Sequence, residues 1–234
     1  MNENQFKEEL QKINIYPTPN QIMQIEEFYK LLVEWNKKIN LTAITEKEDV
    51  YLKHFYDSLT IVKACDLSKE KNLCDIGTGA GFPGIVIKII FPELKICLVD
   101  SLNKRIKFLN IVIEKLQLTN IETVHSRAEE FSKINRKTFD VVTARAVTSL
   151  PVLLEYCIPL LKVGKYFIAL KGNAEEEIKN SKNALKILNS TISKKIEFNL
   201  PVENSRRTIL VIKKLGNISD KYPRSINEII KKSL

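Results

Sequence analysis

The chain has 234 residues, of which 44% are hydrophobic and 28% are charged, so it can bury the core of one large domain with an appendage. Lysine and arginine exceed aspartate and glutamate by 37 − 28 = 9, which favours a polyanionic partner such as nucleic acid, although a basic surface also serves solubility alone. No stretch approaches the ~18 apolar residues of a membrane-spanning helix, and the charged N-terminus lacks the apolar segment of a signal peptide, so we expect a cytoplasmic protein without a membrane partner.

The first 70 residues predict a cap of helices. Apolar residues recur at helical spacing over residues 2–13, from about residue 18 to Trp35, and from Glu46 to Ala64. Within the last of these helices, His54 and Asp57 lie three residues apart on one face. They either share a local hydrogen bond or help to close a pocket, and the sequence leaves both roles open.

Residues 72–84 read N-L-C-D-I-G-T-G-A-G-F-P-G, which predicts a buried strand, a glycine-rich turn and a helix. Glycine permits positive φ and lets a ligand approach the backbone closely. Two ligand classes use such a turn. Residues 79–84 satisfy the dinucleotide fingerprint GxGxxG, which is weak alone. Asp75 followed by GxGxG instead resembles motif I of the class I S-adenosylmethionine (SAM) methyltransferases.

The acidic residue before the glycines separates these two interpretations. In the class I methyltransferases, the acid of motif I, which corresponds to Asp75, orients the ammonium-bearing methionine end of SAM. A pyrophosphate, in contrast, gains nothing from a neighbouring carboxylate. Asp100 follows the next strand at the distance where an acid meets a ribose diol, and it fits either cofactor. No tyrosine has a lysine four residues later, which argues against a dehydrogenase with a Tyr-x-x-x-Lys pair.

Strands and helices alternate from residue 72 onward, the pattern of a parallel sheet covered on both faces. We expect helices at 103–116, 150–161 and 174–188 and strands at 72–76, 95–99, 121–125, 139–143, 166–170, 194–200 and 207–215. The predicted fold is α/β, with the seven-stranded, mostly parallel Rossmann-like sheet of a class I SAM-dependent methyltransferase. The predicted domains are a helical cap (1–70), a SAM-dependent methyltransferase domain (71–215) and a mobile basic tail (216–234).

Arg145 follows the fourth strand, at the sheet edge where open α/β folds bind ligands. A guanidinium does not deprotonate, so Arg145 cannot be a base. It can hold a phosphate, a carbonyl edge or the cofactor carboxylate, or form an ordinary salt bridge.

The Asn/Asp-Pro-Pro-Tyr motif for exocyclic amines and the Pro-Cys nucleophile for pyrimidines are both absent. Guanine N7 has an in-plane lone pair and needs only positioning, but a small molecule with a free lone pair would suit the site equally.

Seven ordered blocks together resemble one family. They are Asn40-Leu-Thr42, His54-x-x-Asp57-Ser58, Asp75-Ile-Gly-Thr-Gly-Ala-Gly-Phe-Pro-Gly84, Asp100-Ser-x-x-Lys104-Arg105, Ser126-Arg127-Ala128-Glu129, Ala144-Arg145-Ala146 and Leu170-Lys171-Gly172. This set, spread over residues 35–215, is similar to the bacterial small-subunit rRNA guanine-N7 methyltransferases, formerly called glucose-inhibited division protein B. The resemblance implies SAM-dependent methylation of one guanosine in 16S rRNA, either naked or within a small ribosomal subunit, with S-adenosylhomocysteine as product.

The same resemblance assigns roles to individual residues. Arg145 would position the acceptor as the catalytic residue without a general base, and the cofactor contacts would be Asp75, Gly77, Gly79, Gly81, Phe82, Asp100, Ala128, Glu129 and Arg145. From charge and predicted location, we choose as rRNA phosphate contacts Lys104, Arg105, Lys171, Arg206 and Arg207. We expect no metal site, because the four cysteines form no CxxC and only two histidines occur.

Two other functions stay open at this stage. One is a SAM-dependent methyltransferase that acts on a small molecule, and the other is an inactive, SAM-responsive RNA-binding module. The protein is expected to be a monomer. The tail departs from the family pattern, because residues 222–230 turn apolar and allow a short helix.

Overall fold

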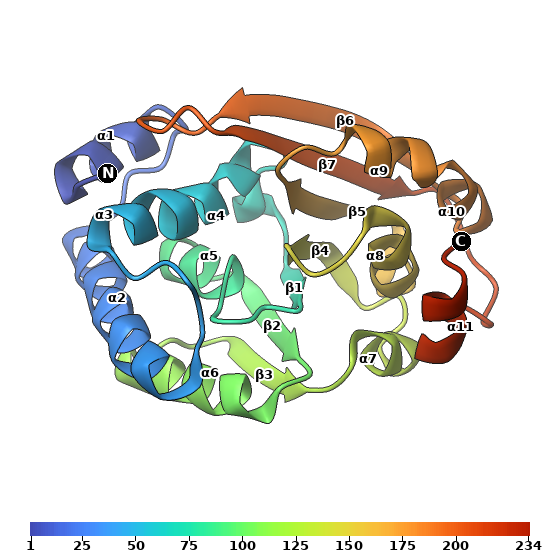
Figure 1. Cartoon of the computed structure of the whole chain (residues 1–234), viewed down its shortest axis with the longest axis horizontal. Helices are drawn as coiled ribbons and strands as arrows, with labels where there is room; N and C mark the ends of the chain where they lie inside the picture. The colour runs from blue at the N-terminus through green and yellow to red at the C-terminus, as the bar shows by residue number, and fades with distance from the viewer.

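The computed structural model describes residues 1–234 and shows helices on both sides of a seven-stranded sheet (Figure 1). The strands are β1 (Asn72–Ile76), β2 (Lys95–Asp100), β3 (Ile121–His125), β4 (Phe139–Arg145), β5 (Leu161–Lys171), β6 (Ser190–Asn199) and β7 (Arg206–Lys214). They are ordered β3-β2-β1-β4-β5-β7-β6. Strands β1 to β5 pair in parallel, and β7 is antiparallel to both neighbours. The expected mostly parallel sheet is confirmed.

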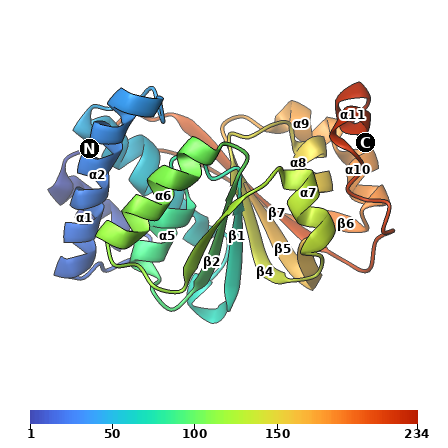
Figure 2. The same ribbon diagram turned by 90° about the horizontal axis from the view of Figure 1, so that it is seen from below.

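The helices form two outer layers (Figure 2). One layer contains α1 (Glu3–Gln11), α2 (Pro19–Ile39), α5 (Gly84–Ile90) and α6 (Asn103–Lys115). The other contains α7 (Ala128–Ile134), α8 (Leu150–Cys157), α9 (Glu175–Asn180), α10 (Lys182–Ile187) and α11 (Ile226–Lys231). None of these helices combines the length and the apolar content needed to cross a membrane.

Alternate strand residues enter two separate cores. Leu73 and Leu98 pack with the first helical layer, whereas Cys74 and Val99 pack with the second. This alternation follows from the two-residue period of a strand, which points successive side chains to opposite faces. Burial on both faces therefore fixes the register and brings the carboxyl ends of the parallel strands to one edge, where this fold binds ligands.

The helix expected over Glu46–Ala64 changes its winding along its length. It begins as α3 (Lys47–Val50), widens into a π-helical segment, η1 (Tyr51–Tyr56), and continues as α4 (Asp57–Leu59) and a 3₁₀ turn, η2 (Thr60–Lys63). Wide π turns are rare and occur often at functional sites. This one carries His54 and ends directly before Asp57, so it sets how both side chains leave the cap.

The chain after β7 is packed against the rest of the protein, unlike the mobile tail expected from its basic composition. Ile218, Tyr222 and Ile229 are buried in the second core, and the short helix suggested by the apolar pattern is α11. The expected helix over 174–188 is divided into α9 and α10, and Ser181 between them donates its hydroxyl to Glu177 O at 2.6 Å. The apolar residues of this segment therefore decide its packing, which the basic composition did not indicate.

Candidate functional site

The glycine-rich turn after β1 is fastened to the end of β2. The N–H groups of Gly77 and Thr78 both donate to Val99 O, at 2.9 and 3.1 Å. The N–H of Gly79 donates to Asp100 Oδ2 at 2.9 Å. The φ angles of Gly77 and Gly79 are 68° and 62°, in the left-handed region that glycine adopts without strain. The sequence pattern therefore produces the predicted turn.

Gly79 borders open space, unlike two other glycines of the turn. A Cβ on Gly84 would lie 2.2 Å from Leu98 Cδ2, and one on Gly81 would lie 2.5 Å from Ile85 Cγ1. Packing of the helix against the sheet thus requires both glycines. A Cβ on Gly79 would meet nothing closer than a backbone oxygen at 3.9 Å. Gly79 is therefore the position where a ligand can approach the backbone.

A cavity of about 400 Å³ opens beside this turn, and we call it the cofactor cavity. Four predicted cofactor residues line it, namely Gly77, Asp100, Ala128 and Glu129. The lining residues that were not predicted for the site include Val147, Tyr156 and Ile226. None of the three belongs to a motif with known chemistry, and the only signal for Ile226 was the apolar pattern of the tail.

Asp75 lies beneath the turn and has no exposed surface. Its Oδ2 accepts a hydrogen bond from Gly84 N–H at 2.9 Å, whereas its Oδ1 and the hydroxyl of Thr78 are buried without a partner. Burial raises the pKa of Asp75 to about 6, against the lowering effects of the Thr78 hydroxyl next to its carboxylate and of the Gly84 N–H. Buried polar atoms without partners are rare in proteins. The contact of Asp75 with the methionine end of SAM stays a prediction, because Asp75 and Gly79 are not among the residues that line the cofactor cavity.

Asp100 organises the loop after β2. Its carboxylate accepts hydrogen bonds from the N–H groups of Gly79 and Leu102, both at 2.9 Å, and from Arg105 Nη1 at 3.3 Å. The contact of Asp100 with a ribose stays a prediction. Arg105 lines the cofactor cavity as well, so the structure places this predicted rRNA contact beside the cofactor site.

A second cavity, of about 440 Å³, lies next to the first, and we call it the acceptor cavity. Ala146 lines both cavities. The acceptor cavity combines residues of the helical cap with residues at the ends of β4, β5 and β7; its charged lining residues are Lys53, Asp57, Arg145, Lys171, Glu177 and Arg207. Segments far apart in the sequence therefore meet here.

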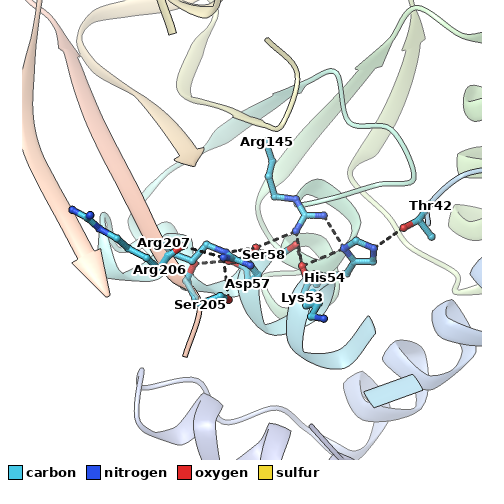
Figure 3. A network of polar contacts seen from close by, with 10 residues as sticks. Thr42, Lys53, His54, Asp57, Ser58, Arg145, Ser205, Arg206 and Arg207 are labelled. Atoms are coloured by element: carbon cyan, nitrogen blue, oxygen red, sulfur yellow. Dashed lines mark hydrogen bonds and ion pairs between the residues drawn. The ribbon is translucent and has the colours of Figure 1, made fainter. Parts of the chain in front are cut away.

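Arg145 connects β4 to the helical cap (Figure 3). Its Nη1 donates to Lys53 O at 2.9 Å and to Asp57 Oδ2 at 3.4 Å, and its Nη2 donates to His54 Nδ1 at 3.1 Å. Since a guanidinium only donates, His54 Nδ1 accepts, and the proton on Nε2 points to Thr42 Oγ1 at 2.8 Å. Burial and the positive charge of Arg145 lower the pKa of His54 to about 3. His54 is therefore neutral at physiological pH.

Asp57 is the carboxylate that two arginines share. Arg207 Nε lies 3.2 Å from both of its oxygens, and Arg145 is its second partner. His54 and Asp57 do not bond to each other, so the local hydrogen bond considered from the sequence is not formed. Arg145 Nε and Arg207 Nη2 have no hydrogen-bond partner in the protein.

The turn also contacts this network through Phe82. The ring of Phe82 stacks on His54 with centroids 4.5 Å apart, and the guanidinium carbon of Arg145 lies 5.2 Å from the Phe82 centroid. Phe82 is not among the residues that line the cofactor cavity, and neither is Arg145. Their direct contact with a cofactor stays a prediction, whereas Phe82 does contact His54 and Arg145, which line the acceptor cavity.

The remaining basic residues predicted to meet rRNA differ in their surroundings. Lys171 has a side chain only 8% exposed, and its Nζ donates to Glu177 at 2.8 Å and to Thr148 O at 2.7 Å. Arg206 lies on the surface in ion pairs with Glu175 and Glu197. Lys104 is exposed and makes no ion pair. Lys104 thus has the most freely available charge of these residues, and the rRNA contacts stay predictions.

Comparison with known proteins identifies close relatives. The family model described as GidB, rRNA small subunit methyltransferase G, matches residues 21–208. The ribosomal RNA small subunit methyltransferase G of Acetivibrio thermocellus is 55% identical over 208 residues, which cover 86% of this chain and 85% of that protein. The protein of the same name from Bacillus cytotoxicus is 51% identical over 227 residues, covering 96% of this chain and 95% of the relative.

Solved structures resemble the fold at much lower sequence identity. A SAM-dependent O-methyltransferase from Thermotoga maritima has a TM-score of 0.54 at 15% identity, covering 80% of this chain and 73% of that one. A precorrin-6y C5,15-methyltransferase from Geobacter metallireducens has a TM-score of 0.51 at 14% identity, and the match covers 75% of this chain and 92% of that one. These similarities confirm the predicted class I SAM-dependent methyltransferase fold.

Proposed function

The chain belongs to the rRNA small subunit methyltransferase G family, and from this premise we propose that it transfers a methyl group from SAM to N7 of one guanosine in 16S rRNA. The observation that supports this most directly is that the cofactor cavity and the acceptor cavity share Ala146, directly after β4. A methyl donor in one cavity and a nucleotide in the other would meet at the ligand-binding edge of the sheet. The net charge of +9 favours RNA over a small acceptor.

When bound, SAM supplies an electrophilic methyl group on a positively charged sulfur. Asp75 and the open edge at Gly79 would hold the methionine end, Asp100 would hold the ribose, and the corner at Ala128 and Glu129 would hold the adenine. Asp100 and Glu129 line this cavity together with Arg105 and Arg127, and Asp100 forms an ion pair with Arg105. The choice of SAM over a dinucleotide therefore rests on the family match and on the fold.

The acceptor cavity has no group free to act as a general base. His54 has its Nδ1 occupied by Arg145 and a pKa near 3, and Asp57 is held by two arginines. Glu177 accepts hydrogen bonds from Lys171 and from the N–H of Leu150. An acceptor amine would have to lose a proton here. Guanine N7 loses none and needs only to be positioned in line with the methyl group.

Positioning would come from the two arginines that share Asp57. Arg145 Nε and Arg207 Nη2 are the donors that these residues keep for an acceptor, and an arginine suits a phosphate or a carbonyl oxygen such as guanine O6. The substrate is rRNA, either naked or in a small-subunit particle. We propose that the enzyme acts as a monomer in the cytoplasm.

The test is to incubate the protein with tritiated SAM and either naked 16S rRNA or small-subunit particles, and then to cleave the labelled RNA at N7-methylguanosine. Label at a single cleavable guanosine is expected. The Arg145→Lys variant should lose most of the methyl-transfer activity, because an ammonium group cannot reproduce the several fixed N–H donors of a guanidinium. Label on another atom would overturn the N7 assignment. Transfer to neither RNA, with SAM and RNA still bound, would favour the inactive RNA-binding module, whereas SAM binding without RNA binding would favour the small-molecule enzyme.

A further inference from the structure

One wall of the cofactor cavity comes from the segment that follows the last strand. Ile226, the first residue of α11, lines this cavity together with Tyr156 of α8 and with Ala128 at the start of α7. The side chain of Ile226 is half-buried and packs on the second core. An apolar side chain therefore borders the end of the cavity where the corner after β3 would hold an adenine.

An ion pair fixes the entry to α11. Arg224 donates its backbone N–H and its Nε to Glu155 Oε1, both at 2.8 Å, and its Nη2 to Glu155 Oε2 at 2.8 Å. The side chain of Glu155 is fully buried, and its neighbour in α8 is the cavity residue Tyr156. A charge-assisted, bidentate pair of this kind restricts geometry as well as adding energy. It therefore holds Ile226 and Tyr156 in a set relation to each other.

A second arginine fastens the chain just before this pair. Arg136 donates to the carbonyl oxygens of Tyr222 and Ile218 and forms an ion pair of 3.1 Å with Asp220. The side chains of Ile218 and Tyr222 are buried in the second core. Arg136 and Arg224, together with the buried side chains of Ile218 and Tyr222, thus hold the segment after β7, whose exposed surface is otherwise basic.

We propose that Ile226 is a binding residue for the adenosine part of SAM, and that the Arg224–Glu155 pair positions it. An apolar side chain against a purine face removes apolar surface from water on binding. Ile226 would close the cavity on the adenine side, while the glycine-rich turn holds the methionine side. The inference rests on the proposed cofactor, SAM, and not on the proposed acceptor. It therefore does not depend on which nucleotide receives the methyl group.

The test compares Ile226→Ser with Ile230→Ser, a matched control on the same helix whose side chain is 76% exposed. Calorimetry would measure the affinity of each variant for S-adenosylhomocysteine and for 5′-methylthioadenosine, which keeps the adenosine and lacks the amino-acid end. Ile226→Ser should weaken both ligands by about tenfold, the effect of losing roughly two buried methyl or methylene contacts. Ile230→Ser should leave both affinities unchanged.

Two outcomes would overturn the proposal. Equal affinities in the two variants would remove Ile226 from the site, and a loss confined to S-adenosylhomocysteine would place its effect at the methionine end. The thermal midpoint without ligand shows that each variant is folded.

The Arg224→Lys variant tests the positioning role of the Arg224–Glu155 pair, because lysine keeps the charge and loses the bidentate geometry. It should weaken both ligands in the same proportion, and unchanged affinities would exclude the positioning role of the pair. Since these measurements use no RNA, failed methyl transfer would count against the acceptor assignment alone.

Discussion

Asp57 precedes Arg207 by 150 residues, yet both of its carboxylate oxygens lie 3.2 Å from Arg207 Nε. The carboxylate comes from the helical cap and the guanidinium from β7, so this contact joins the first segment of the chain to one of its last strands. Because Asp57 also accepts a hydrogen bond from Arg145, it sets the distance between the two arginines that we assign to the acceptor.

Replacing Asp57 by Asn should impair methyl transfer more than cofactor binding. The substitution keeps the size of the side chain and leaves two half-buried arginines without their countercharge, which should lower the free energy of unfolding by about 3 kcal/mol. Methyl transfer to small-subunit RNA should fall at least tenfold while the affinity for S-adenosylhomocysteine changes little. Asp49→Asn is the control, since Asp49 pairs with Lys53 at the surface. Equal effects in the two variants would contradict the role of Asp57.

Gly79→Asp should abolish cofactor binding with little loss of stability. The side chain would enter the open space beside the turn, and the left-handed φ of 62° would add a strain of about 1–2 kcal/mol. Gly84→Ala should do the reverse, because its Cβ would lie 2.2 Å from Leu98 Cδ2 and force the helix from the sheet. Calorimetry and denaturant unfolding of both variants would separate binding from stability. Normal SAM affinity in Gly79→Asp would refute the proposed cofactor site.

The affinity for S-adenosylhomocysteine should rise as the pH increases from about 5 to 7. Burial raises the pKa of Asp75 to about 6, and a ligand ammonium near this residue favours its ionised form. Without ligand, the same ionisation of Asp75 has the opposite effect on the stability of the folded protein. Between pH 4 and 6 the folded protein binds more protons at Asp75 than the unfolded chain does, so this residue makes the free energy of unfolding fall as the pH rises.

Asp75→Asn isolates this contribution from that of other carboxylates. Calorimetric titrations of the variant across the same pH range should show a flatter pH dependence of affinity. Its unfolding curves should lack the part of the slope between pH 4 and 6 that Asp75 causes. If the variant kept the pH dependence of the wild-type affinity, another group would control it.

Lys104→Ala should reduce the salt dependence of RNA binding more than Arg206→Ala. Lys104 is exposed and unpaired, whereas Arg206 already has two carboxylate partners, Glu175 and Glu197. A residue that neutralises one phosphate contributes about 0.7–0.9 to the slope of log K against log salt. Filter binding of 16S rRNA at several salt concentrations measures this slope. A larger effect at Arg206 would reverse the assignment.

The glycine-rich turn and the strands could be predicted because their signals are local. Strand alternation, the acid of Asp75 and the clustered glycines each specify nearby backbone geometry. The long-range contacts could not be predicted in this way. Nothing in the spacing of Lys171 shows that Glu177 and Thr148 would enclose its ammonium, and helical periodicity over 46–64 does not reveal a π turn. The place of Ile226 likewise depends on the Arg224–Glu155 pair, which joins residues 69 positions apart.

The contact between Asp57 and Arg207 also has a consequence for the timing of protein synthesis. During translation the cap emerges first and β7 much later, and domains generally fold as their segments become available. A nascent chain that ends before Arg207 has Asp57 with only one of its two arginine partners, Arg145, and an acceptor cavity without one wall. The cavity that we assign to the acceptor is therefore complete only after β7 has left the ribosome that is making the chain.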